Sequence, residues 1–436
     1  MNQKIDYIST RGKSVSIGWL VCMLGALFYC YEYLLRIEPG VMVPELMREF
    51  NITAANLGLV AAIYYFAYTP MQVVVGILID RYGARLVLTC AVTACTLGSF
   101  LFGISESIYV IGFGRLLIGF GSAFAFVGVM KLAAEWLPKH HFALFAGFTV
   151  SLAMVGAMVG DVELTLLIHK IGWKSALYIS TGVGVVLIPM IWILVRDTPK
   201  WKESHSGKIS FRETFIGLGQ IIKNPQMWFS GIIGCAFFLS LSVFAELWGI
   251  PFLRNVYKLS PGVAAFACSM VFAGWLVGAP INGWLSDKNK TRKLPLIIGG
   301  SVSAIIITII IFKPINISIE FLDILLFFFG IFSSVQIVCF AISKENNPTH
   351  VAATAVAFTN LLIMTGALVF QPLIGKLLDI SWIGRIHEGV RVYSAANYQH
   401  ALLILPVSIV IGVILSFILR ESFGREDWDE FDVESS

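Results

Sequence analysis

Long apolar stretches and short polar loops alternate along the chain. Twelve apolar stretches, each about 20 residues long, run from Val15 to Leu419. At a rise of 1.5 Å per residue, a helix of about 20 residues crosses the ~30 Å hydrocarbon layer of a membrane. The pattern therefore predicts an all-α polytopic membrane protein with twelve transmembrane helices. We place them at residues 15–36, 55–79, 85–104, 108–136, 142–168, 174–196, 227–252, 261–285, 294–312, 319–343, 350–378 and 397–419.

The two halves of the chain repeat one pattern. Pro44, Gly76 and Asp80 align with Pro251, Gly283 and Asp287 at one constant spacing. Such matches at helix ends, glycines and polar positions indicate an internal repeat. The predicted organisation is an N-terminal segment (1–14), a six-helix bundle (15–196), a connector (197–226), a second six-helix bundle (227–420) and an acidic tail (421–436). Parallel repeats of this kind place a solute site between the two bundles, near the membrane midplane.

The distribution of Lys and Arg predicts the orientation. Most of the 31 basic residues lie on the side that carries both termini, above all in the connector and at residues 288–293. Loops rich in Lys and Arg remain cytoplasmic, so we expect both termini in the cytoplasm. The net charge of +4 then reflects topology and contact with membrane lipids, and it does not indicate nucleic-acid binding.

A charged loop follows the second helix of each half. The first copy reads Gly76-Ile-Leu-Ile-Asp80-Arg81-Tyr-Gly83-Ala-Arg85; the second begins Gly283-Trp-Leu-Ser-Asp287 and lacks the second glycine. Both copies resemble the signature loop of the major facilitator superfamily (MFS). The stretches Tyr31-Glu-Tyr-Leu-Leu-Arg36 and Glu135-Trp-Leu-Pro138, with the helix 4 run that ends at Lys131, further resemble a poorly characterised bacterial branch of that superfamily. The resemblance implies two pseudo-symmetric six-helix bundles in the bacterial cytoplasmic (inner) membrane.

In that superfamily this loop forms a conformational latch. Gly76 would allow close helix packing and Asp80 would face the N-terminus of a neighbouring helix. Lys131 and Glu135 are four residues apart on one helix and are expected to pair beside the loop. The expected latch residues are Gly76, Asp80, Arg81, Gly83, Arg85, Lys131, Glu135, Gly283 and Asp287.

Charged residues inside the apolar stretches are the first candidates for function. Gly114-Arg115, followed by Gly119 and Gly121, resembles the helix 4 motif of the same superfamily. A charge about 10 Å deep in the membrane needs a partner, and Glu32 and Asp161 are predicted at similar depth. Arg115 is thus expected to pair with one of them or to bind a substrate carboxylate.

Glu32 is the leading candidate to bind a proton or substrate. Arg36 lies four residues later, so a purely structural ion pair remains the alternative. For Asp161 the alternative is a salt bridge to Arg115 that docks two helices. Asp161 also replaces a proline of the helix 5 motif of drug/proton antiporters, which makes efflux the less favoured direction. Glu246 is either a third binding candidate or an interfacial residue.

Aromatic and amide side chains complete the predicted site. Tyr65, Tyr68 and Gln72 share one face of the second helix and, with Tyr29 and Tyr31, would line an amphipathic cavity. Simple helix packing is the alternative for these rings. Apart from Glu246, the polar candidates of the second half are the uncharged Gln336, Asn360 and Gln371. The complete set of substrate or proton candidates is Glu32, Arg36, Arg115, Asp161, Tyr29, Tyr65, Tyr68, Gln72, Glu246, Asn360 and Gln371.

The sequence offers no enzymatic motif. Its seven histidines form no metal-spaced cluster, and there is no phosphate-binding loop for ATP. We expect no enzyme activity, cofactor or metal site and a monomer. The predicted function is secondary active transport of a small polar or charged organic solute, by alternating access and with proton-coupled uptake. A drug or metabolite exporter (a proton antiporter) and a transporter-like solute receptor are the alternatives.

Overall fold

The computed structural model describes residues 2–198, 211–312, 317–348, 351–387 and 390–423. Within these residues twelve helices are long and apolar enough to cross a membrane, which confirms the predicted number. The N-terminal half contains α1 (Asn2–Val41), α2 (Val43–Glu49), α3 (Ala54–Tyr82), α4 (Ala84–Ile104), α5 (Ile108–Ser122), α6 (Ala125–Trp136), α7 (Lys139–Val159), η1 (Gly160–Leu164), α8 (Thr165–Ile171) and α9 (Trp173–Leu194). The connector contributes α10 (Phe211–Ile222).

The C-terminal half repeats this plan. It contains α11 (Pro225–Leu239), η2 (Ser240–Trp248), α12 (Gly249–Val256), α13 (Pro261–Lys288), α14 (Lys293–Phe312), α15 (Ile319–Ser333), η3 (Ser334–Ile337), α16 (Val338–Glu345), α17 (Ala352–Ile380), α18 (Ala395–Leu402) and α19 (Ile404–Ile418). A short hairpin of β1 (Ile386–His387) and β2 (Val390–Arg391) is a small exception to the all-α prediction.

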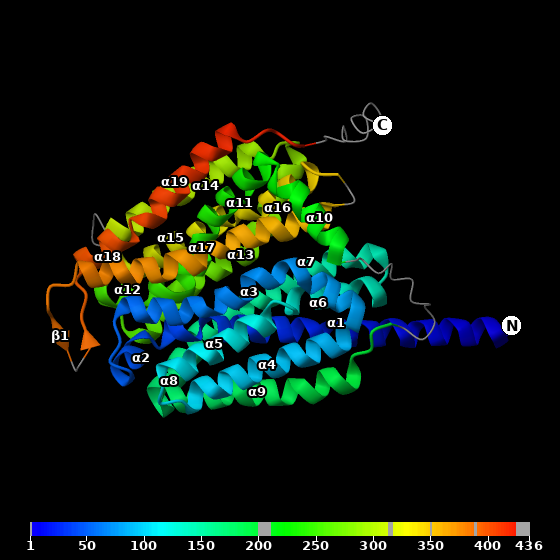
Figure 1. Cartoon of the computed structure of the whole chain (residues 1–436), viewed down its shortest axis with the longest axis horizontal. Helices are drawn as coiled ribbons and strands as arrows, with labels where there is room; N and C mark the ends of the chain where they lie inside the picture. Colours follow the sequence, from blue (N-terminus) through cyan, green and yellow to red (C-terminus); the bar gives the residue numbers. More distant parts are fainter. Residues whose placement is uncertain (1, 199–210, 313–316, 349–350, 388–389, 424–436) are drawn as a thin grey trace.

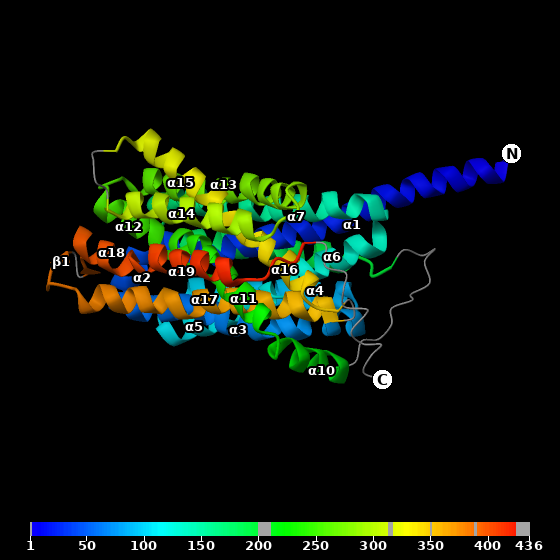
Figure 2. The same cartoon turned by 90° about the horizontal axis from the view of Figure 1, so that it is seen from above.

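The two halves lie side by side, and the helices of both run between the same two ends of the molecule (Figure 1). The start of α1 and the connector helix α10 lie at one end of the bundle, which we name the connector end. The β hairpin lies at the opposite end, which we name the far end. Figure 2 shows α1 extending beyond the other helices at the connector end, so residues 2–14 continue the first helix. The acidic tail that the sequence predicts lies outside the described residues beyond position 423.

Two of the membrane spans contain π-helical turns. Asp161 lies in η1 and Glu246 lies in η2. A π-helical turn shifts the side chains around it relative to a regular helix and is frequent at functional sites. The directions in which both candidate carboxyls point therefore differ from those that the spacing of a regular α-helix predicts.

The repeat extends to the turns of the charged loops. Gly83 has φ +83°, a conformation that favours glycine. The aligned residue of the second half is Lys290, and its φ is +52°. The second loop thus keeps the turn although it has lost the glycine.

In each half, a carboxylate that follows the sixth span binds the start of the third span. The third spans are α4 and α14, and the carboxylates are Asp197 and Glu421. Asp197 accepts a hydrogen bond from the backbone N–H of Arg85 at 2.8 Å. Glu421 accepts one from the backbone N–H of the aligned Arg292, also at 2.8 Å. The free N–H groups at a helix start favour a carboxylate. At the start of α4 this place is taken by Asp197, whereas Asp80 bonds Lys131 at 2.8 Å; a contact of Asp80 with a helix N-terminus stays a prediction.

We predict that Glu421→Ala lowers stability at neutral pH. Burial raises the pKa of Glu421, but hydrogen bonds from the Thr291 hydroxyl and from backbone N–H groups lower it, and the net pKa lies below the ordinary 4.5. The stabilisation is therefore present above the ordinary pKa and is lost as the pH falls through the lowered value. Loss of such a cap costs about 1 kcal/mol. Melting curves from pH 7 to pH 3 should converge for the variant and the parent; a constant difference would contradict this role.

Candidate functional site

A central cavity of about 920 Å³ lies between the two halves. It reaches the connector end, because Asp80 and residues of α10 line it. Among the predicted site residues Tyr29, Tyr68, Gln72 and Asn360 line it; the wall also includes Tyr33, Phe126, Trp275, Gln336 and Met364. The volume suits a small organic molecule, and the mixture of rings and amides suits one with polar groups.

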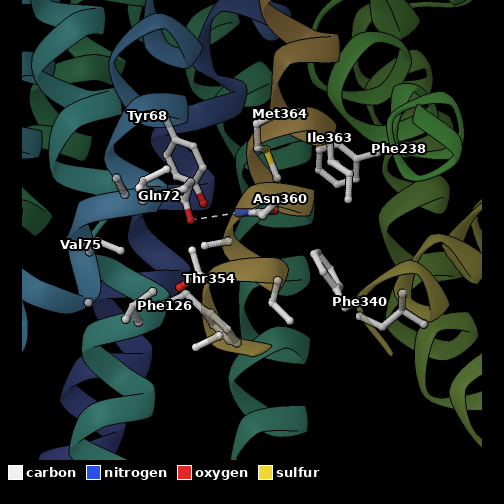
Figure 3. A pocket seen from close by; sticks show the side chains of 18 of the residues that line it. Tyr68, Gln72, Val75, Phe126, Phe238, Phe340, Thr354, Asn360, Ile363 and Met364 are labelled. Carbon is white, nitrogen blue, oxygen red and sulfur yellow. Dashed lines mark hydrogen bonds between the residues drawn. The ribbon is translucent and has the colours of Figure 1, made fainter. Parts of the chain in front are cut away.

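One hydrogen bond crosses the cavity from half to half. The amide nitrogen of Asn360 donates to the side-chain oxygen of Gln72 at 2.9 Å (Figure 3). The nitrogen of the Gln72 amide is buried and has no partner among the described residues. Tyr68 lies beside this pair, and its hydroxyl points toward it (Figure 3). These groups form the polar part of the cavity wall.

A buried charge cluster joins the halves behind this wall. Arg36 of α1 donates to Glu32 at 3.0 Å, and its guanidinium lies 3.9 Å from Glu246 of the other half. All three side chains are almost fully buried. We name Glu32, Arg36 and Glu246 the charge cluster. The helical spacing predicted the Glu32–Arg36 pair, whereas the participation of Glu246 depends on contact between the halves.

Tyrosines surround the charge cluster and separate it from the cavity. The guanidinium of Arg36 lies 4.2 Å from the ring centre of Tyr33 and 5.3 Å from that of Tyr68, and both rings line the cavity. A cation over an aromatic face is stabilised electrostatically. Tyr64 donates to Glu32 at 3.1 Å, and Tyr65 donates to Glu246. Tyr65 thus contacts the cluster and does not line the cavity, contrary to expectation.

Arg115 does not pair directly with Glu32 or Asp161, so that expectation is wrong. Its guanidinium donates to the backbone carbonyls of Leu35 at 2.8 Å and Arg36 at 3.2 Å. It therefore holds the end of α1 that carries the charge cluster. The fully buried Glu38, which the sequence analysis missed, interacts with it electrostatically. The signal was present, since Glu38 follows the predicted end of the first helix by only two residues, and α1 continues to Val41.

Asp161 is buried and incompletely bonded. One of its carboxylate oxygens has no hydrogen-bond partner among the described residues, and the side chain is 1% exposed. Glu246 acts on it electrostatically from the other half. Asp161 is therefore a neighbour of the charge cluster and not part of a structural salt bridge. Tyr31 packs against Gly184 and Thr96 inside the N-terminal half, so it does not line the cavity as expected.

The halves are closed against each other at the far end. Asp379 at the end of α17 accepts hydrogen bonds from the backbone N–H of Ala55 at 2.9 Å and from the Tyr393 hydroxyl at 2.6 Å. It thereby holds the start of α3 from across the interface. Gln371 lies in the same contact region: a Cβ at Gly58 of α3 would lie 2.6 Å from its backbone oxygen, which also accepts a hydrogen bond from Trp248 of its own half at 3.0 Å. Gln371 is therefore a closure residue here and does not line the cavity.

The predicted latch residues make their contacts within each half. Lys131 bonds Asp80 at 2.8 Å and lies 3.8 Å from Glu135. In the second half Arg292 bonds Asp287 at 2.6 Å. A Cβ at Gly76 or at Gly283 would meet no atom within 4 Å, so the expected close packing at these glycines is absent here. The loops are thus separated where the cavity opens.

Comparison with known proteins identifies the family to which this architecture belongs. Residues 21–372 match the model of the Major Facilitator Superfamily. The chain belongs to the Major Facilitator Superfamily. As a member, it is a multi-pass membrane protein of a family whose members carry small-molecule solutes.

Several known proteins are similar to most of this chain. An uncharacterized transporter, YybO, of Bacillus subtilis is 23% identical over 83% of this chain and 88% of its own. A probable hexose phosphate transport protein of Chlamydia pneumoniae is 24% identical over 84% and 87%. A crystal structure of a bacterial homolog of the human lysosomal transporter Spinster, inward-facing and unoccupied, aligns with TM-score 0.75 at 16% identity, over 92% of this chain and 97% of that one.

Proposed function

We propose that this MFS protein takes up a small organic anion by proton-coupled alternating access. The observation that carries the proposal is the charge cluster, because it joins the two halves at the closed end of the central cavity. In this proposal the connector end faces the cytoplasm, and the structure corresponds to the state that is open to that side.

The buried charges support coupling to protons. Among the described residues, six Arg, Asp and Glu side chains are buried within the membrane spans: the arginines Arg36 and Arg115 and the carboxyls Glu32, Glu38, Asp161 and Glu246. If all were ionised, the interior would hold two excess negative charges, and isolated charges in a membrane are strongly unfavourable. Protonation of a carboxyl removes such a charge without moving the backbone. A carboxyl that exchanges its proton between states is therefore a natural coupling site.

Glu246 is the best-placed carrier among these carboxyls. Glu32 receives two hydrogen bonds from Arg36 and one from Tyr64. Glu246 receives one from Tyr65, and its other oxygen has no hydrogen-bond partner among the described residues. Its contacts with Arg36 and Tyr65 cross the interface, so separation of the halves would leave it without them. Protonation of Glu246 would then permit that separation.

Arg36 provides the proposed anchor for the anion. It lies behind the cavity wall, 4.2 Å from the ring centre of Tyr33 and 5.3 Å from that of Tyr68, and rotation of these rings would expose it. A carboxylate or phosphate that binds the guanidinium would compete with Glu246, which links solute binding to proton binding. The similarity to a probable hexose phosphate transport protein supports an anionic solute.

We predict that Glu246→Gln abolishes accumulation driven by a pH gradient and retains solute exchange. The glutamine amide keeps the shape of the side chain and the Tyr65 contact, but it cannot bind and release a proton as a carboxyl does. Uptake and counterflow in proteoliposomes would measure the two activities, with organic anions and sugar phosphates as candidate solutes. Glu163→Gln is the matched control, because Glu163 lies in the same π-helical turn as Asp161 and is exposed.

Three outcomes would change the proposal. Full pH-driven accumulation by Glu246→Gln would exclude Glu246 as the carrier and direct attention to Glu32 and Asp161. Solute binding without any flux in the parent would favour a receptor. Stimulation of efflux by an inward proton gradient would favour the exporter.

A further inference from the structure

A second pocket lies at the far end, outside the closure at Asp379. Its volume is about 370 Å³. Residues of both halves line it, from α2 on one side and from η2, α12 and β2 on the other. The central cavity and this pocket thus lie on opposite sides of the closed interface.

The lining of this pocket is strongly basic. Arg48 comes from the N-terminal half, whereas Arg254, Lys258 and Arg391 come from the C-terminal half. No Asp or Glu is found among its described lining residues. Arg391 bonds Asp379 at 3.2 Å, while Arg254 and Lys258 form no ion pair with any described residue. Converging cations inside a concave surface attract and concentrate anions.

Aromatic side chains form the rest of the pocket and connect it to the closure. Trp248, Tyr393 and Tyr398 contribute to the lining. The hydroxyl of Tyr393 donates to Asp379, and the indole of Trp248 donates to the backbone of Gln371. An occupant of this pocket therefore lies directly against the residues that close the interface, and Trp248 is only two residues from Glu246 in the chain.

We propose that this far-end pocket is a second anion site, which binds a small carboxylate or phosphate group between the two halves. Arg254 and Lys258 supply positive charge that no described residue pairs with, and the rings supply contact for an organic body. An anion held there bridges Arg48 of one half and the three cations of the other, so it stabilises the closure. The proposal goes beyond the transport function above and holds whether or not protons drive it.

Binding of inorganic phosphate and succinate to the full chain in uncharged detergent at pH 7 and low salt tests this site. Arg254→Gln and Lys258→Gln are each expected to weaken binding about tenfold, because each removes a charged hydrogen-bond donor. Lys170→Gln is the matched control: it removes the same charge from an exposed position at the same end, outside the pocket, and should leave affinity unchanged. Binding should also weaken as salt rises.

A cavity variant separates this site from the central one. Asn360→Asp places a negative charge in the central cavity, so it should weaken anion binding there and leave the far-end pocket unaffected. Anion binding that survives Asn360→Asp and is lost in the Arg254→Gln, Lys258→Gln double variant supports the proposal. Binding that is lost in Asn360→Asp and retained in the double variant overturns it, as does an equal loss in Lys170→Gln. Melting curves without anion verify that each variant is folded.

The occupant in the membrane is either a free solute or a lipid headgroup, since both carry the same anionic group. Phosphatidylglycerol added to the mixed micelles distinguishes them. If it displaces phosphate from the parent protein, the headgroup occupies the site; if phosphate binding is unchanged, the site takes a free solute. Both results depend on Arg254 and Lys258 if the proposal is correct.

Discussion

Arg36→Leu is expected to abolish transport and to destabilise the protein in a pH-dependent manner. The substitution leaves Glu32 and Glu246 buried within a membrane without their counter-charge. Removal of one member of a buried ion pair costs about 3–5 kcal/mol, because the remaining charge is uncompensated. A proton can remove that charge, so the loss of melting temperature should be largest near pH 8 and smaller near pH 5.

A charge-free variant provides the control for this prediction. Arg36→Leu combined with Glu32→Gln and Glu246→Gln removes all three charges and should recover much of the lost stability. Melting temperatures of the parent, of Arg36→Leu and of the triple variant show how much of the loss comes from the two carboxylates left without Arg36. Arg36→Lys should remain folded but lose the guanidinium fork, whose Nη2 bonds Glu32 while its Nη1 faces Glu246 at 3.9 Å. Equal melting temperatures for Arg36→Leu and the parent at pH 8 would refute the role of the cluster.

Gly58→Val is expected to open the far-end closure. Gly58 lies on α3 where the helix meets α17, and a Cβ there would lie 2.6 Å from the backbone oxygen of Gln371 and 2.7 Å from the Cα of Pro372. Neither backbone atom can rotate away, so the halves must separate. Overpacking of this kind costs about 1–3 kcal/mol, which changes the ratio of two conformations by roughly 5- to 150-fold.

Distance measurements between spin labels would detect this opening. Labels at Glu106 of the N-terminal half and Arg385 of the C-terminal half, on exposed far-end positions, should show a larger population of long distances in Gly58→Val. Gly182→Val is the matched control, because a Cβ at Gly182 would meet no atom within 4 Å. If both variants give the distance distribution of the parent, this glycine does not determine closure.

The sequence predicted those features that depend on local pattern. Length and hydropathy specified the twelve spans, which the structure confirms, and the alignment of Asp80 with Asp287 specified the repeat. The spacing of Glu32 and Arg36 predicted their contact because four residues bring side chains to one face of a helix. The functional roles assigned to these residues stay predictions.

Contacts between distant segments could not be read from the sequence. Asp379 and Ala55 meet only when the two halves close, and no spacing along the chain encodes that meeting. Arg115 finds backbone carbonyls because α1 passes beside α5 with its last turns turned toward the guanidinium. Glu38 fell outside the first helix because the predicted span ended at residue 36, yet the helix continues to Val41.

The carboxylates Asp197 and Glu421 have a practical consequence for the design of shortened or fused versions of this protein. Each lies just beyond the last span of its half, in a polar segment that a hydropathy profile places outside the membrane. A chain cut at Ile418, or a reporter domain joined there, would lack the Glu421 carboxylate that binds the start of α14. The packing of α14 in the C-terminal bundle would then be weakened. The useful attachment point therefore lies after Phe423, and the junction between the halves should likewise begin after Asp197.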